Sequence, residues 1–179
     1  MRVIAGEFRS RRLKSLPGAA LRPTPDRLRE ALFSVLAPRL AGCTFLDAYA
    51  GCGAVGIEAL SRGASRAVFI ETHRPAVRVI EENLRLLGTE ARSLVIRGQV
   101  LKHLPRIEAD IIFLDPPYGL EREYSQALRL LGEKPPGLVV IVQHSARLAL
   151  EDSYGGLART RTLKQGSNVL SFYEPASKA

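Results

Sequence analysis

The sequence predicts a doubly wound α/β domain built on a seven-stranded, mostly parallel sheet. From residue 44 onward, short apolar segments alternate with helical segments, and strands of this composition are buried on both faces of a parallel sheet. A glycine-rich turn joins the first of these strands to the next helix, which is typical of nucleotide-binding α/β domains. Two later strands lie only a few residues apart, so we expect an antiparallel hairpin at one edge.

The individual elements follow from hydrophobic periodicity and from turn residues. Parallel strands are expected at residues 44–49, 67–71, 93–97, 110–114 and 138–143, and the edge hairpin at 156–163 and 168–173. Helices are expected between them, at residues 54–62, 75–87, 100–104 and 121–131. An earlier helix, residues 27–36, follows a cap at Asp26 and ends at the Ala37–Pro38 step, because the residue before a proline avoids the helical region.

The first 30 residues form a strongly basic segment. They contain eight Arg or Lys and three Asp or Glu, which is a net charge of +5 out of +8 for the whole chain. Two short strands, residues 2–5 and 12–16, predict a small β-hairpin within it. The charge favours a polyanionic partner, which we expect to be nucleic acid, whereas an arginine-rich solvated surface is the plainer alternative.

A length of 179 residues fits one folded domain. We divide it into a basic hairpin extension over residues 1–20, a main domain over 21–175 and a tail over 176–179. No apolar run approaches the roughly 18 residues of a membrane span, and Cys43 and Cys52 show no disulfide spacing. We therefore expect a cytoplasmic protein without membrane association, and no Cys/His cluster predicts a metal site.

The stretch FLDAYAGCGAVG, residues 45–56, carries the first candidate site. Gly51, Gly53 and Gly56 have the GxGxxG spacing, in which glycines let the backbone turn tightly and approach a ligand at a helix N-terminus. Glu71 ends the next strand, where an acid can accept the hydroxyls of an adenosine ribose. Asp47 stands four residues before the first glycine, a pattern seen in enzymes that use S-adenosylmethionine, but the glycine spacing does not distinguish that cofactor from NAD.

Two further positions extend this predicted cofactor site. Ala50 lies inside the glycine turn, and Gln99 follows the third strand. Methyltransferases often carry an acid at the second of these positions, where it accepts from the adenine amino group. The amide oxygen of Gln99 can accept in the same way, although this residue is also suited to starting the next helix.

The strand IIFL, residues 111–114, ends in Asp115, Pro116, Pro117 and Tyr118. In a doubly wound sheet this end faces the same crevice as the glycine loop. The exocyclic amine of a nucleobase is a poor nucleophile because its lone pair is delocalised into the ring, so methyl transfer to it needs acceptors for its N–H bonds. Asp115 and the Pro116 carbonyl can accept them, the rigid prolines hold that carbonyl, and Tyr118 offers a face for stacking. A surface turn is the alternative.

These motifs together resemble the RsmD-type bacterial 16S rRNA (guanine-N2)-methyltransferase family. The matching segments are RVIAGEFRSRRL, LRPTPDRLREALFSVL, LDAYAGCGAVGIEALSRGA, FLDPPY and KQGSNVLSFYEP. The resemblance implies a Rossmann-like class I methyltransferase fold that uses S-adenosylmethionine. It also implies methyl transfer to the N2 amine of a guanine in 16S rRNA, within an assembling small-subunit ribonucleoprotein. The second segment is the most discriminating, because the glycine loop and DPPY also occur in DNA adenine methyltransferases.

The resemblance implies roles for residues outside the two motifs as well. Arg22 and Thr24 match positions in the N-terminal motif that close over the cofactor, with plain loop packing as the alternative. The N-terminal hairpin assists RNA recognition. The RNA-binding candidates are Arg2, Arg9, Arg11, Arg12, Lys14 and Arg27. Arg27 and Arg29 either contact phosphates or form a solvated helix face. Two other functions stay open, namely methylation of adenine N6 in DNA and non-catalytic rRNA binding by an assembly factor; a dehydrogenase is the weakest alternative.

Overall fold

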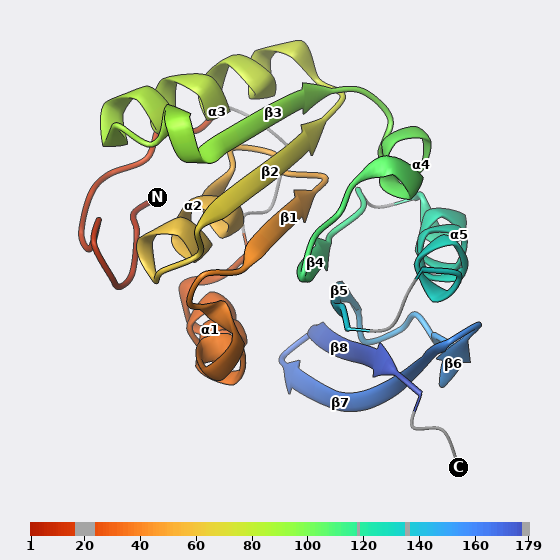
Figure 1. Cartoon of the computed structure of the whole chain (residues 1–179). Coiled ribbons are helices and arrows are strands. Elements are labelled where there is room, and N and C mark those ends of the chain that lie inside the picture. Colours follow the sequence, from red (N-terminus) through yellow and green to blue (C-terminus); the bar gives the residue numbers. More distant parts are fainter. Residues whose placement is uncertain (17–23, 118, 135–136, 177–179) are drawn as a thin grey trace.

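The computed structural model describes residues 1–16, 24–117, 119–134 and 137–176 (Figure 1). In this part of the chain, eight strands form one sheet in the order β3-β2-β1-β4-β5-β8-β7-β6. The strands are β1 (Thr44–Ala48), β2 (Arg66–Glu71), β3 (Ser93–Arg97), β4 (Ile111–Leu114), β5 (Val139–Ser145), β6 (Ser153–Tyr154), β7 (Leu157–Gln165) and β8 (Asn168–Pro175). The mostly parallel sheet with an antiparallel edge is confirmed. The predicted number of strands was one too small, because β6 has two residues and is too short to show alternation.

The strand order reverses direction between β1 and β4. The chain first builds β1, β2 and β3 outward on one side, then crosses over to add β4 and β5 on the other, and these five strands run parallel. Ala48 at the end of β1 lies beside Leu114 at the end of β4. In sheets of this kind, ligands bind outside the carboxyl ends of the strands at such a switch point. The fold therefore brings the loops after β1 and β4 together.

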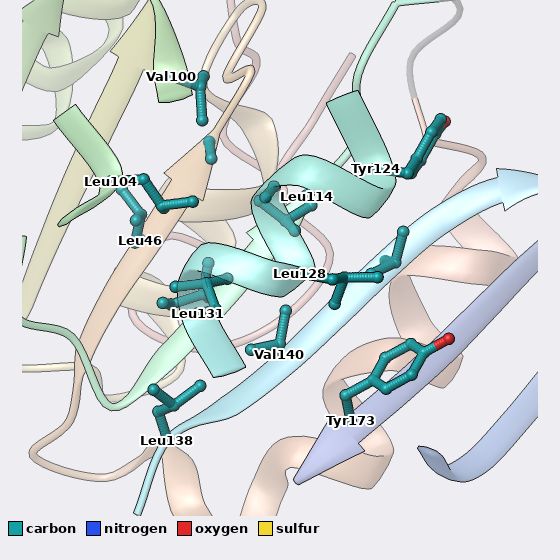
Figure 2. Close-up of a cluster of buried hydrophobic side chains, with 14 of the residues drawn as sticks. Leu46, Val100, Leu104, Leu114, Tyr124, Leu128, Leu131, Leu138, Val140 and Tyr173 are labelled. Carbon is teal, nitrogen blue, oxygen red and sulfur yellow. The ribbon is translucent and has the colours of Figure 1, made fainter. Parts of the chain in front are cut away.

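Helices cover both faces of the sheet. They are α1 (Asp26–Leu40), α2 (Ala54–Ser61), α3 (Arg74–Leu87), α4 (Val100–His103) and α5 (Glu121–Gly132), with 3-10 turns η1 (Glu90–Arg92) and η2 (Leu104–Arg106). On one face, α4 and α5 cover the central strands, and Figure 2 shows Leu128 and Leu131 of α5 over Leu114 and Val140. The opposite face packs against α1, α2 and α3. None of the helices in the described ranges combines the length and apolar content that a membrane crossing needs.

The predicted N-terminal β-hairpin does not form. Within the described residues, the segment makes one isolated antiparallel bridge, between Arg2 and Arg12, instead of two paired strands. The amides of Ile4 and Ala5 donate to the carboxylate of Glu58 in α2, at 2.8 and 3.0 Å. A carboxylate is a stronger acceptor than a strand carbonyl. The amides of Val3 and Leu13 still bond across the segment, to the carbonyls of Arg11 and Met1 at 3.0 Å, but the pairing stops there. The prediction was wrong because the first predicted strand turns at Ile4 and Ala5 to a side chain far along the sequence.

The same N-terminal segment is part of the folded body. Val3, Phe8 and Leu13 are buried in a cluster with residues of α2 and α3. The amide of Lys14 donates to the side chain of Asn83 in α3 at 2.8 Å, and the Asn83 amide group returns a bond to the Lys14 carbonyl at 3.1 Å. Residues 1–16 are therefore packed as a core component and expose their basic side chains outward.

Helix α1 differs from its prediction at both ends. Pro25 occupies the N-cap position, and Asp26 is the first helical residue rather than the cap. The helix continues through Pro38 to Leu40. A proline removes one N–H donor, but Pro38 lies in the last turn, and Leu40 is buried in the same cluster as the rest of the helix. We attribute the extra turn to that burial, which offsets the missing bond.

Candidate active site

A cavity of about 870 Å³ opens along the carboxyl ends of neighbouring strands. It is lined by Glu71 of β2, Asp47 of β1, Asp115 after β4 and Ser145 of β5. Because adjacent strands lie about 4.8 Å apart, the row from β2 to β5 spans about 14 Å. The N-terminal segment contributes to the wall through Met1 and its last residues. This volume is in the upper part of the range for small-molecule sites, and it follows the switch point of the sheet.

The glycine loop is held by two carboxylates. Asp47 Oδ2 accepts from the amide of Gly56 at 2.8 Å, in the first turn of α2. Glu71 Oε2 accepts from the amide of Gly51, also at 2.8 Å. A side chain at Gly56 would place its Cβ 2.4 Å from a ring carbon of Phe69, so only glycine lets α2 approach β2 this closely. The predicted strand–turn–helix context of the glycine motif is therefore present.

Two carboxyl groups in the cavity have raised pKa values. Burial raises the pKa of Asp47 to about 8; the N–H of Gly56 opposes this shift, and the charges of Asp115 and Glu71 add to it. Burial raises the pKa of Asp115 to about 7. Both groups ionise more readily when a cation lies next to them. The site therefore favours a ligand that carries positive charge.

The loop after β4 forms the other part of the cavity. Asp115, Pro116 and Pro117 line it, and Tyr118 lies outside the described residues. The hydroxyl of Tyr124, from α5, lies 3.5 Å from the Pro116 carbonyl oxygen and donates to it. A carbonyl oxygen has two lone pairs, so the same oxygen can accept a second donor. The predicted acceptor groups therefore face the same space as the glycine loop.

The segment before α1 reaches the far end of the cavity. Thr24 is buried, and its hydroxyl donates to the side-chain oxygen of Gln143 in β5 at 2.9 Å. Both residues line the cavity, which puts Thr24 beside the loop after β4 at the β5 end. Arg22 lies outside the described residues. Gln99 is exposed at the N-cap of α4, and the neighbouring Val100 lines the cavity in its place.

Of the remaining predicted cofactor residues, Ala50 and Gly51 line the cavity. Gly53 is the N-cap of α2, with a φ of 79°, and acts on the shape of the loop rather than on the cavity lining. Sequence reasoning missed Tyr49, Gln143 and His144, which also line the cavity. Their position directly at or after the carboxyl ends of β1 and β5 is the signal that could have identified them.

The RNA-binding candidates lie on the surface. Arg2, Arg9, Arg11, Arg12, Lys14 and Arg27 are all exposed. Lys14 forms an ion pair with Glu82 at 2.8 Å. Arg29 is wholly buried, and its Nη2 donates to the Arg2 carbonyl and to Asp26. The prediction that Arg29 forms a phosphate contact or a solvated face was therefore wrong, because helix periodicity turns this position inward.

Comparisons with known proteins agree with this geometry. The profile of the family described as "Conserved hypothetical protein 95" matches residues 1–174. The chain is 33% identical over 183 residues to YlbH of Bacillus subtilis (strain 168), provisionally named an rRNA methyltransferase, with 97% of this chain and 98% of that protein covered. It is 36% identical over 150 residues to ribosomal RNA small subunit methyltransferase D of Haemophilus influenzae, with 79% and 77% covered. Its structure is similar to that of an Escherichia coli protein provisionally named methyltransferase yhhF, with a TM-score of 0.86, 30% identity and 99% of both chains covered.

Proposed function

The chain belongs to the family described as conserved hypothetical protein 95, and from this premise we propose that it is an rRNA methyltransferase that uses S-adenosylmethionine. Its acceptor is the N2 amine of a guanine in 16S rRNA, within a small ribosomal subunit that is still being assembled. The names of the similar curated proteins support the rRNA substrate. The resemblance of the segment at residues 21–36 supports the choice of guanine N2.

One observation carries the proposal: two chemically different groups share a single cavity across the β1–β4 junction. Asp47 and Glu71 lie on the β1 and β2 side, and Asp115 with Pro116 lies on the β4 side. A methyl donor and an amine must approach to about 3–3.5 Å before transfer. Loops that leave adjacent strands are suited to hold the two reactants at that distance.

The cofactor side fits S-adenosylmethionine, which supplies a methyl group activated by a positively charged sulfur. Asp47 is 2% exposed and is costly to ionise where it stands. A cationic ligand beside it compensates that cost. Glu71 already accepts from the amides of Gly51 and His73, each at 2.8 Å. Oε1 also accepts from the Thr72 hydroxyl at 3.4 Å, whereas Oε2 has the Gly51 amide as its one donor within the described residues. A carboxylate oxygen has two lone pairs, so Oε2 can also receive a ribose hydroxyl.

The acceptor side fits an exocyclic amine. Ionised Asp115 accepts one N–H of the amine, and the Pro116 carbonyl accepts the other, which draws the nitrogen lone pair toward the methyl group. The new N–C bond forms as the S–C bond breaks, and the nitrogen then gives up one proton, either to Asp115 or to solvent. Because the pKa of Asp115 is about 7, it can hold this role near neutral pH.

The basic surface supports the polyanionic substrate. Arg2, Arg9 and Arg12 project from a segment that is packed on the protein body and that also borders the cavity through Met1. Cations on this segment can bind the RNA backbone by phosphate contacts while a base enters the cavity. The base has to be unstacked to reach Asp115.

The test uses small subunits from a strain that lacks the modification, incubated with the intact chain and labelled S-adenosylmethionine. We expect label in 16S rRNA, N2-methylguanosine on nucleoside mass spectrometry, and loss of transfer in Asp115→Asn but not in the exposed Glu108→Gln. N6-methyladenosine as the product would identify the adenine enzyme instead. No transfer, together with no binding of S-adenosylmethionine in calorimetry, would refute the proposal and favour a non-catalytic assembly factor.

A further inference from the structure

Tyr49, the first residue after β1, has an unusual backbone conformation. Its φ is 66°, in the left-handed region that disfavours residues with a Cβ. Its ring packs against the hydrophobic cluster beneath α5 and lines the cavity. Its hydroxyl donates to Glu123 Oε2. Burial raises the pKa of Tyr49, and the hydrogen bond to Glu123 raises it further, so the hydroxyl stays protonated as the donor.

The partner of Tyr49 lies in the first turn of α5. This turn follows directly on the loop after β4, which we call the acceptor loop. The amide of Leu120 donates to the Pro117 carbonyl at 3.2 Å, and the amide of Glu123 donates to the Leu120 carbonyl at 2.9 Å. The residue after Glu123 is Tyr124, whose hydroxyl contacts the Pro116 carbonyl. One helical turn therefore contacts the glycine loop on one side and the acceptor loop on the other.

We propose that the Tyr49–Glu123 pair is a positioning device. It holds the Pro116 carbonyl at a fixed position relative to the glycine loop. This inference rests on the proposed function. Glu123 anchors the first turn of α5 to the end of β1, and Tyr124 transmits that position to Pro116. Neither Tyr49 nor Glu123 has to contact the transferred methyl group for this to matter, because a displacement of about 1 Å between reacting groups costs about 100-fold in rate.

The arrangement differs from ordinary packing in two respects. Tyr49 is half-buried, and it holds a left-handed backbone conformation that is costly for a residue with a Cβ, with its hydroxyl directed at Glu123. Glu123 is also only partly buried, so it could be solvated instead of bonded. A carboxylate accepts from a hydroxyl more strongly than a neutral group does, which makes this bond a suitable link between the two loops.

The test compares Tyr49→Phe, Glu123→Ala and the double variant with two matched controls. Tyr173→Phe removes another tyrosine hydroxyl bond from the same hydrophobic cluster, the one that the Tyr173 hydroxyl donates to the Glu151 carbonyl at 2.7 Å. Glu121→Gln removes a charge from the same turn of α5 at an exposed position. Glu123→Gln keeps an acceptor at position 123 and serves as the conservative variant.

The measurements are kcat and KM for methyl transfer to modification-deficient small subunits, the affinity for S-adenosylhomocysteine, and the melting temperature. We expect Tyr49→Phe and Glu123→Ala each to lower kcat about 10- to 100-fold, with KM and S-adenosylhomocysteine affinity changed less than about threefold. The double variant should be no slower than the slower single variant, because the pair acts as a unit. Glu123→Gln should recover part of the rate, and both controls should keep the original kcat.

A second readout is independent of methyl transfer. Hydrogen exchange at the amides of Leu120 and Glu123 should accelerate in Tyr49→Phe and remain unchanged in Tyr173→Phe. If kcat and exchange are both unaltered in Tyr49→Phe, or if only the melting temperature falls as in Tyr173→Phe, the pair is a packing contact and the inference is wrong. If the unmodified chain transfers no methyl group but exchange responds as expected, the proposed function fails while the link between the loops stands.

Discussion

Replacing Asp115 by asparagine should stabilise the protein at alkaline pH while it removes methyl transfer. Burial raises the pKa of this carboxyl from 3.8 to about 7, so the folded protein holds the proton more tightly than the unfolded chain does. Its contribution to stability is therefore complete below about pH 4 and is lost as the pH rises to about 7. Asparagine has nearly the same shape and no charge at any pH, so it avoids that loss.

The size of the effect follows from the pKa difference. One pKa unit corresponds to 1.36 kcal/mol, which gives about 4 kcal/mol for a carboxyl that is completely dry. Asp115 lines an open cavity, and water there screens part of the charge. We therefore expect Asp115→Asn to raise the free energy of unfolding by about 2–4 kcal/mol at pH 8.5, and by less than about 0.5 kcal/mol at pH 4.

Urea unfolding followed by circular dichroism, at a series of pH values from 4 to 9, measures this difference directly. Glu108→Gln, which removes an exposed carboxylate, should change stability by no more than about 0.5 kcal/mol throughout. A difference between Asp115→Asn and the parent protein that is flat with pH, or that reverses sign, would show that the carboxyl is not desolvated in solution. The account of Asp115 as an acceptor tuned by burial would then be wrong.

Three further changes test other parts of the site. Binding of S-adenosylmethionine should release protons and strengthen as the pH rises toward about 8, because a cation lowers the raised pKa of Asp47. Calorimetry in buffers of different ionisation enthalpy measures the number of protons released. Proton uptake on binding would contradict this prediction. Gly56→Ala should lower the free energy of unfolding by about 1–3 kcal/mol through its clash with Phe69, as measured by chemical denaturation. An unfolding free energy equal to that of the parent protein would mean that α2 can shift away from β2. Arg9→Ala combined with Arg12→Ala should make the slope of log binding constant against log salt concentration, for binding to the subunit, shallower by about 2. The melting temperature should not change. An unaltered slope would exclude both side chains from the RNA interface.

The parts of the fold that were predictable have local signals. The apolar runs of β1, β2, β4 and β5 reveal strands because both faces of the central sheet are buried. The glycine spacing predicts the turn before α2, because glycine is needed where the backbone adopts a positive φ or where elements pack closely. The DPPY stretch is identifiable because a rigid polar end on a buried strand is unusual. These signals place the two halves of the cavity at the correct strand ends.

The parts that were not predictable depend on contacts between distant residues. Tyr49 and Glu123 are 74 positions apart, and Thr24 and Gln143 are 119 apart. A tyrosine after a strand is common, and so is a glutamate in the first turn of a helix. Neither local sequence predicts that the two residues contact each other. The N-terminal hairpin failed for the same reason, since Glu58, a helical residue over fifty positions away, supplies acceptors that no strand pattern indicates.

The packing of residues 1–16 onto α2 and α3 also sets an order of events during synthesis. This segment is translated before its partners, because Glu58 follows Ile4 by 54 positions and Asn83 follows Lys14 by 69. At about 5–20 residues per second, roughly 3–14 s pass between the emergence of Lys14 and that of Asn83. During that interval, the cluster that buries Val3, Phe8 and Leu13 is incomplete. The N-terminal part of the cavity lining can therefore form only after α3 has left the ribosome.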